Sequence, residues 1–375
     1  MQLLPELDVG GVERGTVEIA AALVQNGHRA IVVSAGGRLV AELSALGAAH
    51  ETLAIGRKHV RTLGCIAPLR DLMVRHDVDI VHARSRLPAW IGARAIRGLP
   101  VAQRPAWVTT VHGPYTVNRY SRIMTSGERV IAISEFIRTY ITDNYPRVPA
   151  DRIRVIPRGI DRALYPSGYV PDAAWRAGFF AQYPQLHGRR LLVAPGRLTR
   201  WKGQEEFVHM IARLVRDGRP VHGLLAGGDG GRGRFTDDLQ ALIAAHDLQS
   251  HVTLLGNRGD LREILALADI AYSLTIEPEA FGRTTAEALS LGTPVIGYAH
   301  GGTGEILRDV LPEGLVPLRD IDAAAAATAR FLDAPPAVPD EHPYTLARMQ
   351  DATLAVYAEL EARAGRDAPG QDAKS

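Results

Sequence analysis

The sequence predicts an α/β protein built from two Rossmann-like domains, and three observations support this prediction. Short β-rich runs alternate with helical patterns from end to end, which is typical of βαβ units and parallel sheets. The 375 residues exceed the length at which a single core usually divides. The alternation lapses between residues 163 and 190, where proline and glycine accumulate. We therefore expect an N-terminal domain over 1–165, a linker over 166–189 and a second domain over 190–342.

Short apolar runs mark the strands of the first domain, with helical patterns over 12–26 and 135–144. A run such as Ala30–Val33 is apolar throughout, as in parallel strands that helices cover on both faces. The expected strands are Leu3–Leu4, Ala30–Val33, Asp79–His82, Trp107–Val111, Val130–Ile133 and Arg154–Ile156.

The second domain repeats this alternation and is followed by an amphipathic helix. We expect this helix over 343–362, and after it a polar, disordered tail over 363–375. The expected strands are Leu191–Ala194, Gly223–Ala226, Val252–Leu255, Ile270–Tyr272 and Val295–Gly297.

The composition excludes several classes of protein. The single cysteine, Cys65, allows no internal disulfide and favours a reducing compartment. No apolar run approaches the ~18–20 residues of a membrane span, and no signal peptide precedes Gly10, so we expect a cytoplasmic protein. Aromatic residues make up only 6% of the chain, too few for a stacking surface, so no nucleic-acid partner is expected.

The charge is distributed unevenly along the chain. Residues 1–188 carry 23 Lys and Arg against 15 Asp and Glu, a balance of +8, whereas residues 189–375 carry 20 against 26, a balance of −6. A basic first half would attract an anionic membrane surface or a phosphorylated acceptor. Scattered, solvated arginine is an equally good interpretation.

The most informative stretch lies between Glu279 and Glu287, two carboxylates eight positions apart. Glu279 sits in a loop that turns at Gly282, and Glu287 lies inside the amphipathic helix that follows. The helix N-terminus, with Thr284 and Thr285 in its first turn, offers unpaired N–H groups that attract phosphate. Carboxylates beside such a site are placed to accept hydrogen bonds from hydroxyls, so the pattern predicts a nucleotide-sugar site. A solvated helix Glu beside a loop Glu is the alternative.

This segment resembles the E-x7-E signature of glycosyltransferase family 4. The match extends to Phe281-Gly282, Glu287-Ala288 and residues 292–296, and the resemblance covers the chain from Gly10 to about Leu360. It implies the GT-B fold, in which two Rossmann-like domains have parallel sheets that face each other across a cleft, and a C-terminal helix crosses back to the N-terminal domain. It also implies a retaining, metal-independent hexosyltransferase.

The resemblance assigns roles to residues of the second domain. Glu279 is expected to hold sugar hydroxyls and Glu287 the ribose. Arg197 and Lys202 are expected to hold the donor diphosphate, a role that suits fixed cations because a departing diphosphate accumulates negative charge. Lys202 is one of only three lysines in a chain with 40 arginines. The other donor-binding residues are expected to be Phe281, Gly282, Arg283, Thr284 and Thr285.

Two features of the first domain are expected to face the donor. Gly10-Gly11 precedes the first helix, where glycines let backbone N–H groups approach a ligand, although a tight turn would look the same. His112 ends the strand Trp107–Val111, at the edge where α/β sheets bind ligands. The family carries a His near the donor sugar at the matching position, so His112 is a predicted catalytic residue.

Other residues of the first domain point to the acceptor. His82, Arg84 and Arg86 end another strand and are expected on the acceptor side. The stretch 156–161 has Arg158 where the family often has Asn, and it resembles bacterial enzymes of lipopolysaccharide or other envelope glycans.

One motif is misleading. Residues 228–233 match G-x-G-x-x-G after a strand, which suggests a dinucleotide site. They open the second unit of their domain, and the next strand ends in Gly256-Asn257 rather than in an acidic residue that would bind a ribose. We expect a loop that borders the cleft, with Asn257 and Arg258 near the base of the nucleotide.

We therefore predict a retaining glycosyltransferase that moves a sugar from a nucleotide-sugar to a glycan or lipid-linked glycan of the cell envelope. The departing diphosphate would help to deprotonate the acceptor hydroxyl. No cofactor or metal is expected, because no cluster of Asp, Glu and His stands out near the proposed phosphate ligands. A nucleotide-sugar epimerase of GT-B fold is one alternative, against which the E-x7-E pattern argues. A non-catalytic sugar-binding protein is the other, and it would be expected to lack one of Arg197, Lys202, Glu279 and Glu287.

Overall fold

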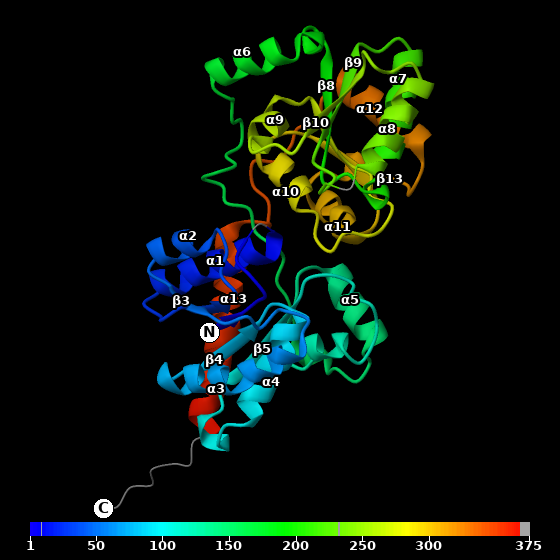
Figure 1. Cartoon of the computed structure of the whole chain (residues 1–375). Helices are drawn as coiled ribbons and strands as arrows, with labels where there is room; N and C mark the ends of the chain where they lie inside the picture. Colours follow the sequence, from blue (N-terminus) through cyan, green and yellow to red (C-terminus); the bar gives the residue numbers. More distant parts are fainter. Residues whose placement is uncertain (9, 232, 368–375) are drawn as a thin grey trace, which may run out of the picture. The chain divides into compact units, whose positions relative to one another are not determined.

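The computed structural model describes residues 1–8, 10–231 and 233–367 (Figure 1). It divides into two compact units. Unit 1 contains Met1–Gly159 together with the chain from Leu346 onward, and unit 2 contains Ile160–Thr345. The first boundary therefore falls before the predicted linker over 166–189, which belongs to unit 2.

Unit 1 is built around a parallel sheet that has seven strands in the described residues, in the order β3-β2-β1-β4-β5-β6-β7. This is the doubly wound order of a Rossmann-like domain with one further strand. The strands are β1 (Gln2–Leu3), β2 (Ile31–Ser34), β3 (Ala49–Thr52), β4 (Ile80–Ala83), β5 (Ala106–Val111), β6 (Arg129–Ala132) and β7 (Ile153–Val155). The α-helices are α1 (Gly11–Gln25), α2 (Val40–Ala45), α3 (Ile66–Arg75), α4 (Arg86–Arg97), α5 (Glu135–Asn144) and α13 (Leu346–Asp367).

Unit 2 has the same topology around a sheet with six described strands, in the order β10-β9-β8-β11-β12-β13. Renumbered within the unit, this order is 3-2-1-4-5-6, so the prediction of two parallel Rossmann-like domains is confirmed. The strands are β8 (Arg190–Pro195), β9 (Val221–Ala226), β10 (Val252–Gly256), β11 (Ile270–Ser273), β12 (Val295–Tyr298) and β13 (Leu315–Val316). The α-helices are α6 (Ala173–Gln182), α7 (Gln204–Arg216), α8 (Arg234–Ala245), α9 (Leu261–Leu267), α10 (Arg283–Ser290), α11 (Gly301–Val310) and α12 (Ile321–Asp333).

Burial explains why these segments form a helix-covered sheet. Every residue of β2 and of β9 is buried, as expected for strands with helices on both faces. α7 turns one apolar stripe inward, together with the side chain of Gln204, and its charged residues lie outside that stripe. The buried residues of α7 are Gln204, Phe207, Val208, Met210, Ile211 and Leu214.

The predicted linker contains α6, which is docked on unit 2. Asp172 caps the helix by accepting a hydrogen bond from Ala174 N at 2.7 Å. Trp175 Nε1 donates to Asp260 Oδ2 at 2.9 Å, and this bond joins α6 to the start of α9. The prolines and glycines of this segment therefore flank a helix instead of forming an extended linker.

The last helix, α13, packs in the core of unit 1 although it follows unit 2 in the sequence, and Figure 1 shows it beside α1. It runs to Asp367, so residues 363–367 of the predicted tail are helical, and 368–375 lie outside the described residues. The apolar cluster that includes it contains Ile19, Val108, Ile131, Ile156, Met349, Val356, Tyr357 and Leu360.

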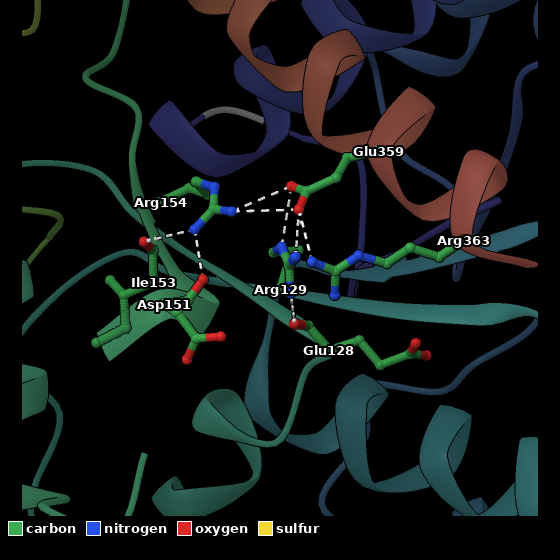
Figure 2. A network of polar contacts seen from close by, with 7 residues as sticks. All are labelled: Glu128, Arg129, Asp151, Ile153, Arg154, Glu359 and Arg363. Atoms are coloured by element: carbon green, nitrogen blue, oxygen red, sulfur yellow. Dashed lines mark hydrogen bonds and ion pairs between the residues drawn. The ribbon is translucent and has the colours of Figure 1, made fainter. Parts of the chain in front are cut away.

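Charge also ties α13 to the sheet of unit 1 (Figure 2). The Glu359 carboxylate accepts a hydrogen bond from Arg129 Nε of β6 at 3.0 Å, and Arg154 of β7 donates to both its oxygens at 3.2 and 3.3 Å. Arg363, one helical turn later, donates at 3.0 Å. The hydrogen bond from Arg129, together with the charges of all three arginines, lowers the pKa of Glu359 to about 2. Because the Arg129 side chain is only 2% exposed, Glu359 is the counter-charge of a buried cation.

Within the described residues, no helix is both long enough and apolar enough to cross a membrane.

Candidate functional site

The candidate site of unit 2 lies at the carboxyl ends of β8 and β11, where the strand order of the sheet reverses. The loop after β8 carries Arg197 and Lys202, and the loop after β11 carries Glu279. Open α/β sheets bind their ligands at such a reversal. The topology therefore brings three of the predicted catalytic residues to one edge of the sheet.

Gly203, at the end of the loop after β8, fixes how the two loops pack. Its φ of 76° lies in the left-handed region, and a Cβ atom there would lie only 1.8 Å from the Leu274 carbonyl oxygen. This close approach sets the short 3₁₀ turn Arg200–Lys202 against the loop after β11, where Ile276 N donates to Trp201 O at 2.8 Å. Glycine is required here because any side chain would push the loops apart.

The packing brings Lys202 to Glu279, which is 77 positions away. Lys202 Nζ donates to Glu279 Oε1 in an ion pair whose side chains are 18% and 10% exposed. Thr303 Oγ1 lies 3.5 Å from the other carboxylate oxygen, and Gly302 N donates to the backbone oxygen of Glu279 at 2.8 Å. Arg197 is exposed, and its guanidinium has no hydrogen-bond or ion-pair partner among the described residues.

The N-terminus of α10 opens beside this pair. Gly282 precedes the helix with φ 94°, and a Cβ there would lie 2.6 Å from Thr303 Oγ1 at the start of α11. No side chain caps α10, so its first backbone N–H groups are available to an anion. Thr284 is half-buried and Thr285 is buried in this first turn.

Several buried polar atoms around this edge lack a partner in the described part of the chain. Buried polar groups in folded proteins are nearly always hydrogen-bonded, so such atoms are able to bind a polar ligand or water. They come from the loops after β8 and β11 and from the first turns of α7 and α10. The atoms are Thr199 Oγ1, Gln204 Oε1, Thr275 Oγ1 and Thr285 Oγ1.

Glu287 and Phe281, the neighbours of this edge, already have protein partners. Arg283 Nε donates to Glu287 Oε1 at 2.9 Å, one helical turn away, and the Glu287 side chain is only 8% exposed. Burial and the adjacent Glu287 raise the pKa of Tyr165 to about 12. Phe281 is buried and packs edge-to-face on Tyr344. The predicted contact of Glu287 with a ribose would therefore compete with Arg283 and Tyr165. The sequence analysis named Arg283 but not Tyr165, which lies just before the predicted linker.

The two residues predicted to lie near the base differ in their surroundings. Asn257 is exposed above Gly228, where a Cβ would meet the Asn257 Cβ at 3.3 Å. The Arg258 guanidinium binds Asp260 through two hydrogen bonds of 2.8 and 2.6 Å, and Asp260 also holds Trp175 of α6. Arg258 thus helps to hold α6 on unit 2, because it binds the same aspartate as Trp175.

The G-x-G-x-x-G loop is closed by its own aspartate. Asp229 Oδ1 accepts from Gly231 N, and Oδ2 accepts from Gly233 N and from Thr236 Oγ1, at distances of 2.8 to 3.0 Å. These hydrogen bonds lower the pKa of Asp229. A carboxylate therefore fills the N-terminus of α8, where a dinucleotide phosphate would otherwise bind.

In unit 1, His112 follows β5 at the carboxyl edge of the sheet. Arg158, which follows β7, donates from one Nη to His112 Nδ1 at 2.8 Å. His112 Nε2 is buried and has no partner among the described residues. Burial and the charges of Arg158, Arg84 and His82 hold the pKa of His112 well below its usual value, so the ring is neutral.

The predicted acceptor residues separate into two groups. His82 is buried between Tyr357 Oη and Thr110 Oγ1, each 2.6 Å from a ring nitrogen. Arg84 is buried and donates to Gln2 Oε1 at 3.0 and 2.6 Å. The structure therefore places both inside unit 1.

Arg86, the third predicted acceptor residue, lies at the start of α4 and differs from His82 and Arg84. Its guanidinium stacks on the rings of Tyr115 and Tyr120, at 4.8 and 5.4 Å. Tyr120 is 37% exposed, so this stack borders solvent.

Gly10 and Gly11, at the N-terminus of α1, differ in the space around them. The backbone of Gly10 is extended, with φ 163°, and no atom lies within 4 Å of a Cβ built on Gly11. The N-terminus of α1 has no side-chain cap, and the Glu13 carboxylate lies over Gly10. A turn conformation that only glycine adopts is therefore not the reason for this pair.

Carboxylates are not gathered into a metal site in the described residues, where no group of three or more His, Cys, Asp or Glu side chains could hold an ion. The chain has two Asp-x-Asp pairs, at Asp77/Asp79 and Asp320/Asp322. Asp320 caps α12 through Ala323 N, and Asp322 binds Arg213. The first pair flanks the amino end of β4, opposite to the edge where ligands bind.

Comparison with known proteins agrees with this architecture. Residues 9–164 match the family model Glycosyltransferase Family 4, and residues 178–344 match the model Glycosyl transferases group 1. The D-inositol 3-phosphate glycosyltransferase of Mycolicibacterium gilvum is 28% identical over 292 residues, which cover 76% of this chain and 61% of that protein. The chain matches about half to two thirds of the length of its curated relatives, from 46% to 67% in two of them.

Solved structures resemble the whole chain. A glycosyltransferase from Rickettsia africae superposes with a TM-score of 0.78 at 27% identity and covers 96% of this chain and 98% of its own. HepE of Anabaena, solved in complex with UDP and glucose, superposes with a TM-score of 0.71 at 21% identity and 97% coverage of both chains. With a Family 4 model over its first half and a group 1 model over its second, the chain belongs to the GT-B glycosyltransferases.

Proposed function

We propose that the chain transfers a sugar, with retention of the anomeric configuration, from a nucleotide-sugar to a glycan acceptor. The observation that carries this proposal is the Lys202–Glu279 pair at the strand-order reversal of unit 2, beside the uncapped N-terminus of α10. A cation and a carboxylate in contact at an anion-binding helix end match the two halves of such a donor. The phosphates need positive charge, and the sugar hydroxyls need an acceptor of hydrogen bonds.

Donor binding would exchange the partners of this pair. The diphosphate would take Lys202 and the exposed Arg197, and Glu279, released from Lys202, would accept hydrogen bonds from the sugar hydroxyls. As the bond between sugar and phosphate breaks, negative charge builds up on the diphosphate, and the two cations stabilise it. A diphosphate oxygen then takes the proton of the acceptor hydroxyl on the same face of the sugar, which gives retention.

The reaction would need no metal ion. Arg197 and Lys202 supply the positive charge that a divalent ion otherwise brings to a diphosphate. The two Asp-x-Asp pairs are used elsewhere, one as a helix cap and an ion-pair partner, the other at the amino end of β4.

For the acceptor we propose a phosphorylated or lipid-linked glycan of the cell envelope, handled at the inner face of the membrane. One relative is named for an acceptor that carries phosphate, inositol 3-phosphate. Unit 1 presents a surface that fits an anionic membrane around its 3₁₀ helix Val60–Cys65, and we call it the η1 surface. Two apolar side chains there are 73% and 57% exposed among three exposed cations. The η1 surface comprises Arg57, Lys58, Val60, Arg61 and Leu63.

The test starts with thermal unfolding in the presence of UDP-, GDP- and ADP-sugars, each compared with its free sugar. A donor at 100 times its dissociation constant should stabilise the protein by ~2.7 kcal/mol. The stabilising nucleotide-sugar is then incubated with and without lipid-linked and soluble glycans, and the anomeric configuration of the product is read by NMR.

Each outcome has a distinct meaning. A product that needs an acceptor and keeps the donor configuration supports the proposal. An altered nucleotide-sugar formed without an acceptor would identify an epimerase. Binding without turnover on any acceptor would favour a sugar-binding protein, and an inverted product would refute retention.

A further inference from the structure

Arg158 and His112 form a buried pair at the carboxyl edge of the unit 1 sheet. They follow β7 and β5, and one Nη of Arg158 lies 2.8 Å from His112 Nδ1. Arg158 is 8% exposed. Arg158 stands where family 4 often has Asn, so the pair depends on a residue that differs from the common one.

The chemistry of the pair fixes the position of one proton. A guanidinium stays protonated and only donates hydrogen bonds, so Nδ1 must accept. A neutral imidazole that accepts at Nδ1 carries its hydrogen on Nε2. That Nε2–H is buried and has no partner among the described residues, so it is a donor available to a ligand.

The groups that face His112 hinder its protonation. Burial, and then the charges of two arginines and a buried histidine, lower its pKa. His112 N also donates a hydrogen bond to Tyr115 Oη at 3.2 Å. Arg86 stacks on the same tyrosine. The surrounding groups are Arg158, Arg84, His82, Tyr115 and Arg86.

A glycine on α1 makes room for the arginine. A Cβ atom on Gly15 would lie 2.3 Å from an Nη of Arg158, so a side chain at this position would displace the guanidinium. Gly15 lies inside α1 with a negative φ, where glycine costs about 0.5–1 kcal/mol relative to alanine. Space for Arg158 accounts for that cost.

We propose that Arg158 is a positioning residue that holds His112 as the neutral Nε2–H tautomer, so that His112 donates a hydrogen bond to an oxygen of the nucleotide-sugar. The oxygen is a sugar hydroxyl or a phosphate oxygen, because only an acceptor satisfies Nε2–H. The contact with the donor depends on the proposed function, whereas the tautomer does not.

The tautomer is tested on the free protein by long-range ¹H–¹⁵N NMR of labelled histidines, with His112 assigned from His112→Gln. We expect a protonated Nε2, an unprotonated Nδ1 and a pKa of His112 well below that of an ordinary histidine. Arg158→Met should mix the tautomers and raise the pKa of His112, whereas Arg158→Lys, which still donates, should keep Nε2–H. Gly15→Ala should act in the direction of Arg158→Met. A protonated Nδ1 in the wild-type protein, or an unchanged spectrum in Arg158→Met, would overturn the proposal, and the wild-type spectrum decides even if a variant does not fold.

The catalytic consequence is measured with UDP-glucose as the probe, through its slow hydrolysis to UDP and glucose. Arg158→Met should lower kcat by at least about tenfold, since a misplaced proton disables a hydrogen-bond donor. Binding of free UDP should change less than twofold. His112→Gln keeps an N–H near the ε position, so adding Arg158→Met to it should cost little more. Equal losses from Arg158→Met in both backgrounds would show that Arg158 acts independently of His112. Failure of this assay with the expected tautomer intact would count against the donor contact alone.

Discussion

Two ion pairs, one in each unit, differ in whether the polar groups around them are already hydrogen-bonded within the protein. Lys202–Glu279 in unit 2 and Arg129–Glu359 in unit 1 both join segments far apart in the sequence, 77 and 230 positions respectively. Glu359 is saturated by three arginines. The pair in unit 2 lies at an edge of the sheet whose loops and first helical turns carry buried hydroxyl and amide oxygens without partners in the described residues. The saturated network leaves no polar group for a ligand, whereas the other edge has polar groups that a nucleotide-sugar could satisfy under the proposed function.

The largest expected effect is at Lys202. Lys202→Ala should lower kcat/KM for the nucleotide-sugar by roughly 10²-fold or more, because a lost contact to developing charge costs ~3 kcal/mol. Because Lys202→Ala leaves the Glu279 carboxylate, only 10% exposed, without its counter-charge, the urea midpoint is measured as well and kcat/KM is compared for folded protein. Arg200→Ala is the matched control, because Arg200 lies on the same turn and binds Glu205 and Asp238 at the surface. Activity of the Lys202 variant equal to that of the control would remove the diphosphate clamp.

The second prediction concerns stability rather than activity. Glu359→Gln should lower the free energy of unfolding by about 1–3 kcal/mol, less than for a fully buried pair because Glu359 is 31% exposed. Its folded pKa of about 2 lies below its ordinary 4.5, so this stabilisation is present above pH 4.5 and is lost as the pH falls towards 2. The difference from wild type in urea unfolding should therefore shrink between pH 7 and pH 3.

Asp351→Asn, an exposed position on the same helix, serves as the control for this experiment. It should leave the unfolding free energy within ~0.5 kcal/mol of wild type. If Glu359→Gln cost activity at full stability, the distinction between the two pairs would be lost.

A smaller effect is expected at the η1 surface. Vesicles of phosphatidylglycerol should bind the protein at low salt and release it at high salt, because each basic residue contributes ~1 kcal/mol and salt screens it. Val60→Ser with Leu63→Ser should weaken binding, whereas Val101→Ser, at a valine that is 77% exposed outside that surface, should not. If the vesicles do not bind at low salt, the basic residues of the first half are solvated and have no membrane partner.

The smallest expected effect is that of chelation. Excess EDTA should leave the transfer rate unchanged, because Arg197 and Lys202 provide the charge for the diphosphate. A stoichiometric requirement for Mg²⁺ or Mn²⁺ in the same assay would mean that the role assigned to these cations is incorrect.

The sequence predicted the central strands well and missed two at the sheet edges. β3 reads Ala49-His50-Glu51-Thr52 and is exposed or half-buried throughout, and β13 has only two residues. Edge strands have one neighbour and need no continuous apolar run, so hydrophobicity does not reveal them. Within the predicted linker, prolines and glycines concealed the short α6.

The candidate site could be predicted only where a pattern of types and spacing specified it. The loop-and-helix pattern pointed to Glu279, and the resemblance to family 4 pointed to Arg197 and Lys202. Position at a strand end gave no indication of burial, so His82 and Arg84 were placed with Arg86 although their partners, such as Tyr357 and Gln2, come from distant segments. The sequence showed Arg158 only as a departure from the family. Its hydrogen bond to His112, 46 positions away, could not be predicted from the sequence.

The membership of α13 in the core of unit 1 has a consequence for synthesis on the ribosome. Ile19, Val108 and Ile131 are made early, but the helix that covers them follows the whole of unit 2. Unit 2 is contiguous and can therefore finish folding first, while the earlier-made unit waits with an apolar face and the buried cation of Arg129 uncovered. The nascent chain thus has its greatest need for chaperone protection between the emergence of residue 159 and that of Glu359, and a ribosome stalled within unit 2 would hold an aggregation-prone N-terminal half.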